Sequence, residues 1–302
     1  MITRVTHQST QRMSLANMQA NLAKMSDLQS QASSGKLINK ASDDPAKAAE
    51  AMALRKEQRA TEQYARNAQD GVSWLNTVDS AIQSSVDFMQ RARDLTVQGA
   101  NTGAIGAAGR DALAVEIEGI RDALLGQANT TYIGRSVFAG TANGSAFTTA
   151  TDPVTGDVSY TAATVHGTVE RRVGENTTVR VDADGAAVFG DGAASVFSLL
   201  TNIAADLRNP GVNVSTRLTE IDSRIQSMLS VGSSVGARTN QLTAAQDTLS
   251  NQSMTLASDL SGVEDIDLAQ TIIELQMQEV GYKAALGAAA RVLQPSLMDY
   301  LQ

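Results

Sequence analysis

The 302-residue sequence contains no cysteine and only two histidines, His7 and His166. The missing thiols exclude a disulfide framework, an iron–sulfur cluster, a cysteine zinc site and a cysteine nucleophile. Aromatic residues make up 4% of the chain, fewer than the core of a large α/β enzyme usually contains. Because the sequence also shows no nucleophile–base pair, metal-ligand cluster or cofactor loop, we expect a protein that is not an enzyme and needs no cofactor or metal.

Long apolar runs are also missing from the chain. No stretch approaches the roughly 18 apolar residues of a membrane span, and the first residues lack the apolar segment of a cleavable secretory signal. We therefore expect neither a membrane span nor a signal peptide. The net charge of −8 disfavours binding to the phosphates of a nucleic acid, so we expect no nucleic-acid partner.

The two ends of the chain carry opposite net charge. Residues 1–40 hold five basic side chains and one carboxylate, whereas residues 258–302 hold two basic side chains and seven carboxylates. Opposite charges attract, so the two ends should attract each other. Chance sorting of solvated surface charge would look the same, and the distribution alone does not decide between the two.

Apolar side chains recur at alternating spacings of three and four residues near both ends of the chain. Such narrow stripes are typical of a helix that packs against one other helix, and a plain intramolecular bundle is their commonest explanation. Since these stripes lie at opposite ends and carry opposite charge, we predict that the N-terminal helix pairs with the C-terminal helix in a coiled coil. The residues of this predicted assembly seam are Leu15, Met18, Leu22, Met25, Leu268, Ile272, Leu275, Tyr282, Leu286 and Leu293.

Longer helices are predicted between these ends. Asp44 followed by Pro45 is typical of an N-cap and first helical position, which predicts a helix from Pro45 to about Gln98. Further helices are predicted over 110–128 and, from apolar heptads, over 218–260. Glycines at 103, 106 and 109 could cradle a phosphate, but no strand precedes them and no Lys-Ser/Thr follows, so we interpret them as a turn between helices.

Residues 140–195 differ in character, with many Gly, Thr, Val and Asp residues and short alternating runs. We predict a small inserted β domain that folds on its own apolar face, with hairpin turns at 155–157 and 183–185 and His166 in a strand. Asp182 and Asp184 could suggest calcium. The remaining ligand and glycine positions of an EF-hand loop are all alanine here, so we reject a calcium site.

Four motifs resemble a known family. Residues 33–45 read Ser-Ser-Gly-Lys-Leu-Ile-Asn-Lys-Ala-Ser-Asp-Asp-Pro, and residues 89–98 read Met-Gln-Arg-Ala-Arg-Asp-Leu-Thr-Val-Gln. Both are similar to segments shared by bacterial flagellins and flagellar hook-associated proteins. The block within 124–140, and Asp-Ile-Asp-Leu-Ala-Gln at 265–270 with the segment 293–301, favour the proteins of the hook–filament junction over flagellins. The resemblance covers residues 1–140 and 195–302, and the β insert has none.

The resemblance implies a mainly α, flagellin-like fold with three parts. These are a terminal coiled-coil domain (1–40 with 259–302), a helical rod domain (41–139 with 196–258) and the inserted β domain (140–195). It implies a structural subunit that is exported through the flagellar type III channel and forms a ring at the hook–filament junction. The implied partners are further copies of the chain, the neighbouring hook-associated protein FlgK, flagellin, and an export chaperone before secretion. Flagellin itself and, less favoured, a cytoplasmic helical scaffold protein remain as alternatives.

Overall fold

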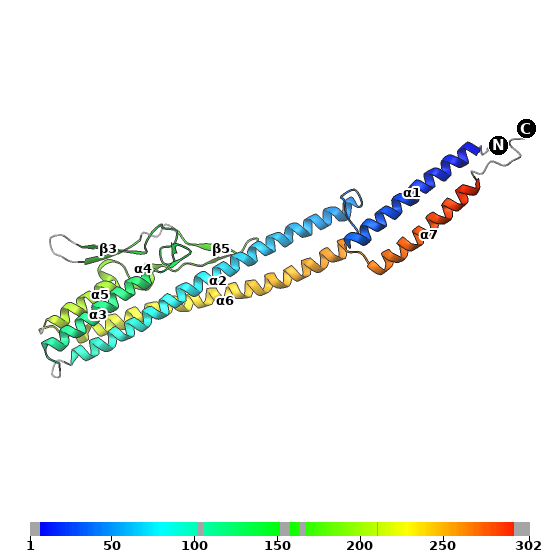
Figure 1. Cartoon of the computed structure of the whole chain (residues 1–302). Helices are drawn as coiled ribbons and strands as arrows, with labels where there is room; N and C mark the ends of the chain where they lie inside the picture. The colour runs from blue at the N-terminus through cyan, green and yellow to red at the C-terminus, as the bar shows by residue number, and fades with distance from the viewer. Residues whose placement is uncertain (1–6, 102–104, 152–157, 164–166, 210, 293–302) are drawn as a thin grey trace, which may run out of the picture. The chain divides into compact units, whose positions relative to one another are not determined.

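The computed structural model describes residues 7–101, 105–151, 158–163, 167–209 and 211–292. The chain forms two compact units, Met1–Ala60 with Gln252–Gln302 and Thr61–Asn251. The predicted mainly helical class is confirmed (Figure 1). The helices are α1 (His7–Ser34), α2 (Pro45–Ala100), α3 (Ala107–Ala128), α4 (Gly185–Phe189), α5 (Val196–Arg208), α6 (Leu218–Glu264) and α7 (Leu268–Val292), with short 3₁₀ turns η1 (Gly192–Ala194) and η2 (Val214–Arg217).

The long helix α2 begins where the sequence predicts. The Asp44 carboxylate accepts hydrogen bonds from the backbone N–H groups of Ala46, at 3.0 Å, and Lys47, at 3.1 Å. These two donors have no partner inside the helix, so the carboxylate satisfies them as an N-cap. The N-cap interpretation of Asp44 is therefore confirmed, and the helix continues to Ala100.

The unit Thr61–Asn251 has a helical core built from α2, α3, α5 and α6. In it α3 lies beside α5 (Figure 1). The α6 side chains that are buried recur every seven residues, as the heptad pattern predicts; within this unit they are Ile221, Met228, Val235, Leu242 and Leu249. The first four of these belong to one apolar cluster, to which α2 contributes the fully buried residues Leu75, Val78 and Met89.

Three antiparallel hairpins interrupt the helices. They pair β1 (Thr131–Tyr132) with β2 (Arg135–Ser136), β3 (Phe147–Thr151) with β4 (Val158–Ala162), and β5 (Glu170–Arg172) with β6 (Thr178–Arg180). Within the residues that the structure describes, each sheet has two strands. The turn predicted at 155–157 and the strand position predicted for His166 lie outside the described residues.

The predicted hairpin turn at 183–185 is wrong. Asp184 has an extended backbone and its carboxylate accepts a hydrogen bond from the N–H of Ala186 at 3.0 Å, so it is the N-cap of α4. An aspartate before a short run of small and apolar residues can start either a turn or a helix, because both use the same side-chain-to-backbone hydrogen bond. Burial of Val188 and Phe189 on α4 favours the helix.

Asp182 has a structural role. Its buried carboxylate binds the Arg180 guanidinium through two contacts of 2.9 Å and accepts a hydrogen bond from the N–H of Val169 at 2.9 Å. These contacts use both carboxylate oxygens. They hold the start of β5 beside the end of β6.

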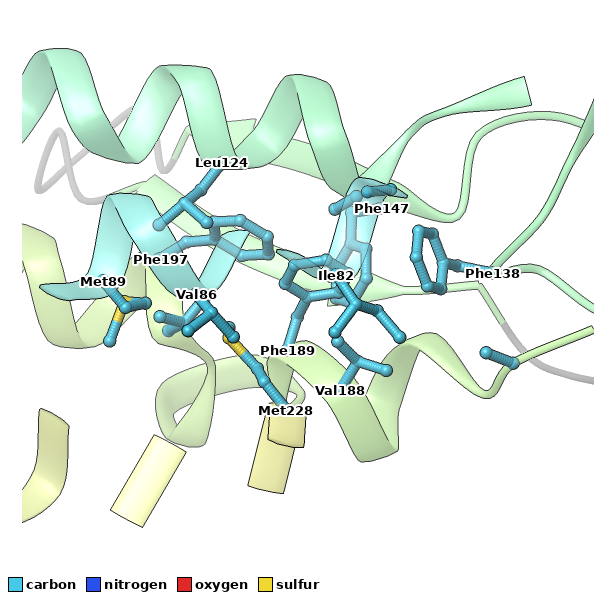
Figure 2. Packing of buried hydrophobic residues seen from close by; sticks show 14 of the residues in the cluster. Ile82, Val86, Met89, Leu124, Phe138, Phe147, Val188, Phe189, Phe197 and Met228 are labelled. Carbon is cyan, nitrogen blue, oxygen red and sulfur yellow. The ribbon is translucent and has the colours of Figure 1, made fainter. Parts of the chain in front are cut away.

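The apolar side chains that the structure describes in the β insert pack into the core of the helices and not on a separate apolar face, which corrects the expectation from the sequence. Phe138, Phe147 and Phe189 form one cluster with Phe197 of α5 (Figure 2). The same cluster includes Ile82 and Val86 of α2, Leu124 of α3 and Met228 of α6. A two-stranded hairpin is too small to bury a core alone, so these hairpins pack onto the helices instead.

We expect Phe189→Ala to destabilise the unit Thr61–Asn251 by about 3–5 kcal/mol, because it removes a fully buried ring that contacts three other phenylalanines. Trp74, the only tryptophan in the chain and a buried one, allows urea unfolding of this unit to be followed by fluorescence. Leu229→Ala, at an exposed position on α6, is the matched control and should change stability by less than about 1 kcal/mol. Equal effects of the two substitutions would contradict a shared aromatic core.

Candidate assembly surface

The terminal helices α1 and α7 pack side by side (Figure 1), as the sequence predicts. Side chains at alternating spacings of four and three residues are withdrawn from solvent on each helix. On α1 they are Ser14, Met18, Asn21, Met25 and Leu28, and on α7 they are Thr271, Leu275, Gln278, Tyr282, Ala285 and Ala289. This heptad spacing is that of two helices in a coiled coil.

The predicted assembly seam divides into two groups in this structure. Met18, Met25, Leu275 and Tyr282 are half-buried in the α1–α7 contact. The others stay between 41% and 55% exposed: Leu15, Leu22, Leu268, Ile272 and Leu286. Leu293 lies outside the described residues. On α7 the exposed positions 272 and 286 follow the contact positions 271 and 285 by one residue, which turns them about 100° around the helix axis.

A further group of exposed apolar residues on α7 was not predicted from the sequence. Ile273, Met277 and Val280, at spacings of four and three, are all more than half exposed. Helical geometry puts them on the side of α7 away from Leu275 and Tyr282. The helix is therefore apolar on several faces, of which α1 covers one. Such a helix is usually buried from all sides, and a count of apolar residues at all positions of the wheel would have indicated this.

The α1–α7 contact contains one polar layer. The Gln278 side-chain amide donates to the backbone oxygen and to the side-chain oxygen of Asn21, both at 3.3 Å. A polar pair inside an otherwise apolar seam favours one register, because sliding either helix would leave both amides without partners. Among the side chains that the structure describes, no ion pair joins α1 to α7.

The opposite charges of the two chain ends meet elsewhere, at Glu264. Its carboxylate is buried, with the residue 4% exposed, and receives the Lys36 ammonium and the Arg55 guanidinium, each at 2.7 Å. Backbone hydrogen bonds flank this pair: Leu37 donates to the Glu264 carbonyl at 2.7 Å, and Ile266 donates to the Gly35 carbonyl at 3.2 Å. Two motifs far apart in the sequence, 33–45 and 265–270, are thus joined here.

Local signals place both chain segments at this junction. Gly35 ends α1 in the left-handed region, with φ 71°, and its N–H donates to the carbonyl of Gln31 at 2.8 Å. Asp267 caps α7 by accepting hydrogen bonds from the N–H groups of Ala269, at 2.9 Å, and Gln270, at 3.1 Å. One helix ends and another begins beside Glu264, so the chain can turn there without unpaired backbone groups.

Burial by itself would raise the pKa of Glu264, but the hydrogen bonds from Lys36 and Arg55 outweigh burial and hold that pKa below its ordinary value. Glu264 was not predicted from the sequence. The charge asymmetry of the two ends was the available signal, but charge alone does not say which of seven acidic residues becomes buried.

Among the described residues, no group of three or more His, Asp or Glu side chains could hold a metal ion. None of the described helices is long and apolar enough to cross a membrane.

A shallow groove of about 300 Å³ lies along the α1–α7 pair, lined by Met13, Met18, Ala285, Ala288 and Ala289 among others. Apolar side chains and a groove are suited to packing against another protein.

Comparison with known proteins assigns the family. The bacterial flagellin N-terminal helical region matches residues 5–143, and the bacterial flagellin C-terminal helical region matches residues 218–301. The chain belongs to the bacterial flagellin family. Together the two matches cover about three quarters of the sequence and contain the whole α1–α7 contact.

Relatives from both branches of the flagellin family align over most of their length. Flagellin of Bacillus subtilis (strain 168) is 26% identical over 280 residues, 87% of each chain. Flagellar hook-associated protein 3 of Escherichia coli (strain K12) is 25% identical over 299 residues, 91% of each chain. The chain is therefore about equally identical to a flagellin and to a hook-associated protein.

Solved structures show the same fold. A flagellar hook-associated protein from Vibrio parahaemolyticus has a TM-score of 0.66 at 20% identity, covering 74% of this chain and all of that one. FlgL from Xanthomonas campestris has a TM-score of 0.59 at 18% identity, covering 69% of this chain and 99% of that one. The arrangement of long helices and small β hairpins in this flagellin-family chain is thus FlgL-like.

We expect Glu264→Gln to loosen the junction between residues 33–45 and 265–270. Losing the charged hydrogen bonds should weaken the local structure by about 1–3 kcal/mol at neutral pH, and amide exchange at Leu37 and Ile266 should accelerate about tenfold or more. The folded-state pKa lies below the unfolded value of about 4.3. The stabilisation is therefore present above that value and lost as pH falls through the folded-state pKa.

The difference between variant and wild type should accordingly shrink in acid. Glu50→Gln, at an exposed position on α2, is the control and should leave exchange at both amides unchanged. If Glu264→Gln exchanges like the wild type at neutral pH, the Lys36–Glu264–Arg55 cluster does not hold the junction.

Proposed function

We propose that this chain is a structural subunit of the bacterial flagellum that forms the junction between hook and filament, as a FlgL-like protein. The observation that carries the proposal is the similarity to flagellar hook-associated protein 3 over 91% of both chains, together with a FlgL-like fold. The sequence blocks at 124–140 and 265–270 support the junction branch over the flagellin branch. No step of this function requires chemistry by the protein.

Assembly uses the terminal helices. The exposed apolar side chains Leu15 and Leu22 on α1, and Ile272, Ile273 and Leu286 on α7, are covered by the helices of neighbouring copies. Their burial provides the free energy of association, at about 25 cal/mol for each Å² of apolar surface removed from water. Because α7 is apolar on several faces, each copy contacts more than one neighbour.

Three parts of the chain have separate roles in this proposal. Residues 1–40 with 259–302 form the assembly domain, residues 41–139 with 196–258 the helical rod, and residues 140–195 the inserted β part. The ring contacts FlgK on the hook side and flagellin on the filament side. Before export, a chaperone covers the apolar terminal helices, since free they invite aggregation. The protein is then secreted to the flagellum.

Flagellin is the alternative in the same family, and electron microscopy separates the two. In a strain lacking the gene, a junction protein predicts hooks without filaments and flagellin released into the medium. Antibody-gold labelling of complemented cells should mark one short collar at the hook end. Label along the whole filament, or filament growth by the purified chain alone, would instead assign the chain to the filament.

We expect Leu286→Asp and Leu22→Asp to abolish assembly and leave the free chain folded. Both side chains are exposed in the single chain, so circular dichroism should change little. In the ring each substitution buries an unpaired charge at a cost of several kcal/mol per contact, which lowers association more than about 100-fold. Filament retention should then be lost.

Gln276→Asp is the matched control, because Gln276 is exposed on α7 at an already polar position. It introduces the same charge into the same helix and should leave motility intact. Normal motility with both leucine variants would show that these residues do not form the assembly surface. Loss of motility with Gln276→Asp as well would point to a general effect of negative charge on α7.

A further inference from the structure

The methionines of this chain differ in exposure between its two units. The unit Thr61–Asn251 contains Met89 and Met228, and both are fully buried in its apolar cluster (Figure 2). The other unit contains the remaining methionines, of which Met1 and Met298 lie outside the described residues. Those that the structure describes there are all at least partly open to solvent: Met13, Met18, Met25, Met52, Met254 and Met277.

Four of these methionines are the most exposed. Met13 on α1, Met52 on α2, Met254 on α6 and Met277 on α7 are each between 59% and 63% exposed. The chain has no cysteine, so the methionine thioethers are its main sulfur groups open to an oxidant. Oxidation of a sulfur side chain depends on access from solvent, and these four sulfurs are accessible while the chain is a single copy.

The reaction that such a sulfur undergoes with a peroxide is an oxygen transfer. The thioether sulfur attacks one peroxide oxygen, so that an S–O bond forms as the O–O bond breaks. The departing hydroxide takes up the proton of the transferred oxygen and leaves as water. The sulfur is oxidised to a sulfoxide and the peroxide is reduced. The product is a polar side chain in place of an apolar one, and methionine sulfoxide reductases reverse the change.

Two of the four methionines lie on the terminal helices, among apolar side chains that the proposed assembly removes from water. Met277 belongs to the exposed group on α7 with Ile273 and Val280. Met13 lines the groove along the α1–α7 pair, beside Ala285. A thioether adapts well to such a contact. A sulfoxide brings a strong hydrogen-bond acceptor into it, and burying such a group without a partner costs free energy.

We propose that Met13 and Met277 are oxidation sites through which a peroxide controls assembly. The sulfoxides keep a free copy out of the ring, and their reduction restores it. This inference rests on the proposed function and deepens it, because it concerns the regulation of the same assembly surface. Neighbouring copies cover both sulfurs in the ring, so the chain is sensitive before assembly and protected after it.

Peptide mass spectrometry of the full chain treated with hydrogen peroxide tests the sites directly. We expect the four exposed methionines to gain oxygen at least about tenfold faster than Met89 and Met228, which react only when their unit opens. In flagella isolated from cells, oxidation of Met13 and Met277 should be at least severalfold slower than in the free chain. Oxidation of Met277 as slow as that of Met89 in the free chain, or equally fast in both preparations, would overturn the proposal.

Filament retention under shear tests the consequence for assembly. The chain is expressed, with and without hydrogen peroxide, in cells that lack its gene and their methionine sulfoxide reductases. Each strain is compared with its own untreated culture. Peroxide should lower retention about tenfold with the wild-type chain. With Met13→Leu and Met277→Leu combined, the decrease should be less than about twofold, because leucine keeps the surface apolar and takes up no oxygen.

Met52→Leu combined with Met254→Leu is the matched control, because it removes two equally exposed methionines from α2 and α6. This strain should be as sensitive to peroxide as the wild type. Equal protection by both pairs, or none by the pair on the terminal helices, would contradict the proposal. Met277→Gln places a polar side chain of similar length at the same position and should lower retention without any peroxide. Unchanged retention with Met277→Gln would count equally against it.

The two proposals fail in different ways. If a strain lacking the gene keeps its filaments, the junction function is wrong, whatever the oxidation pattern of the free chain. If that strain sheds its filaments and the wild-type chain restores them, but peroxide acts equally on the wild type and on the leucine pair at 13 and 277, the junction function stands and the oxidation control alone is wrong.

Discussion

The helix α7 has more apolar surface than α1 covers, so apolar side chains of α7 remain exposed in the single chain. Two helices in contact bury one stripe each, whereas α7 carries apolar side chains on several faces. The uncovered faces leave apolar side chains exposed. In the proposed assembly, their burial against neighbouring copies uses the same hydrophobic driving force that folds the rest of the chain.

The Glu264 cluster holds the chain locally beside the α1–α7 pair. A buried carboxylate held by Lys36 and Arg55 fixes the segments that enter and leave the α1–α7 pair. Removing water from an ion pair has a high cost unless both partners stay close, so such a cluster selects one geometry more than it adds stability. The Asn21–Gln278 layer has a similar effect on register. Polar groups thus specify a pairing that apolar side chains alone would leave free to slide.

In the unit Thr61–Asn251, the small hairpins depend on the helices for their core. Its hairpins are too small to fold alone, and they share an aromatic core with α2, α3, α5 and α6 (Figure 2). Contacts around Trp74 attach the β1–β2 hairpin to α2 in the same way. The Tyr132 ring lies 5.4 Å from the ring of Trp74, and Arg135 lies over the Trp74 ring.

Local patterns in the sequence were sufficient to predict the helices, the Asp44 cap, the mainly α class and the pairing of the two ends. Heptads, caps and charge act over a few residues and do not depend on the rest of the fold. The tertiary structure decided which apolar positions on α7 face α1. The sequence alone does not distinguish them, because apolar residues shifted by one position, such as Ile272 beside Thr271, follow the same heptad period. The tertiary structure also decided that Asp184 starts a helix, that Glu264 is the buried acid near the C-terminal end of α6, and that the described apolar side chains of the β insert pack onto the helices. Each of these depends on which distant segment supplies the neighbouring side chains, and a linear pattern does not contain that information.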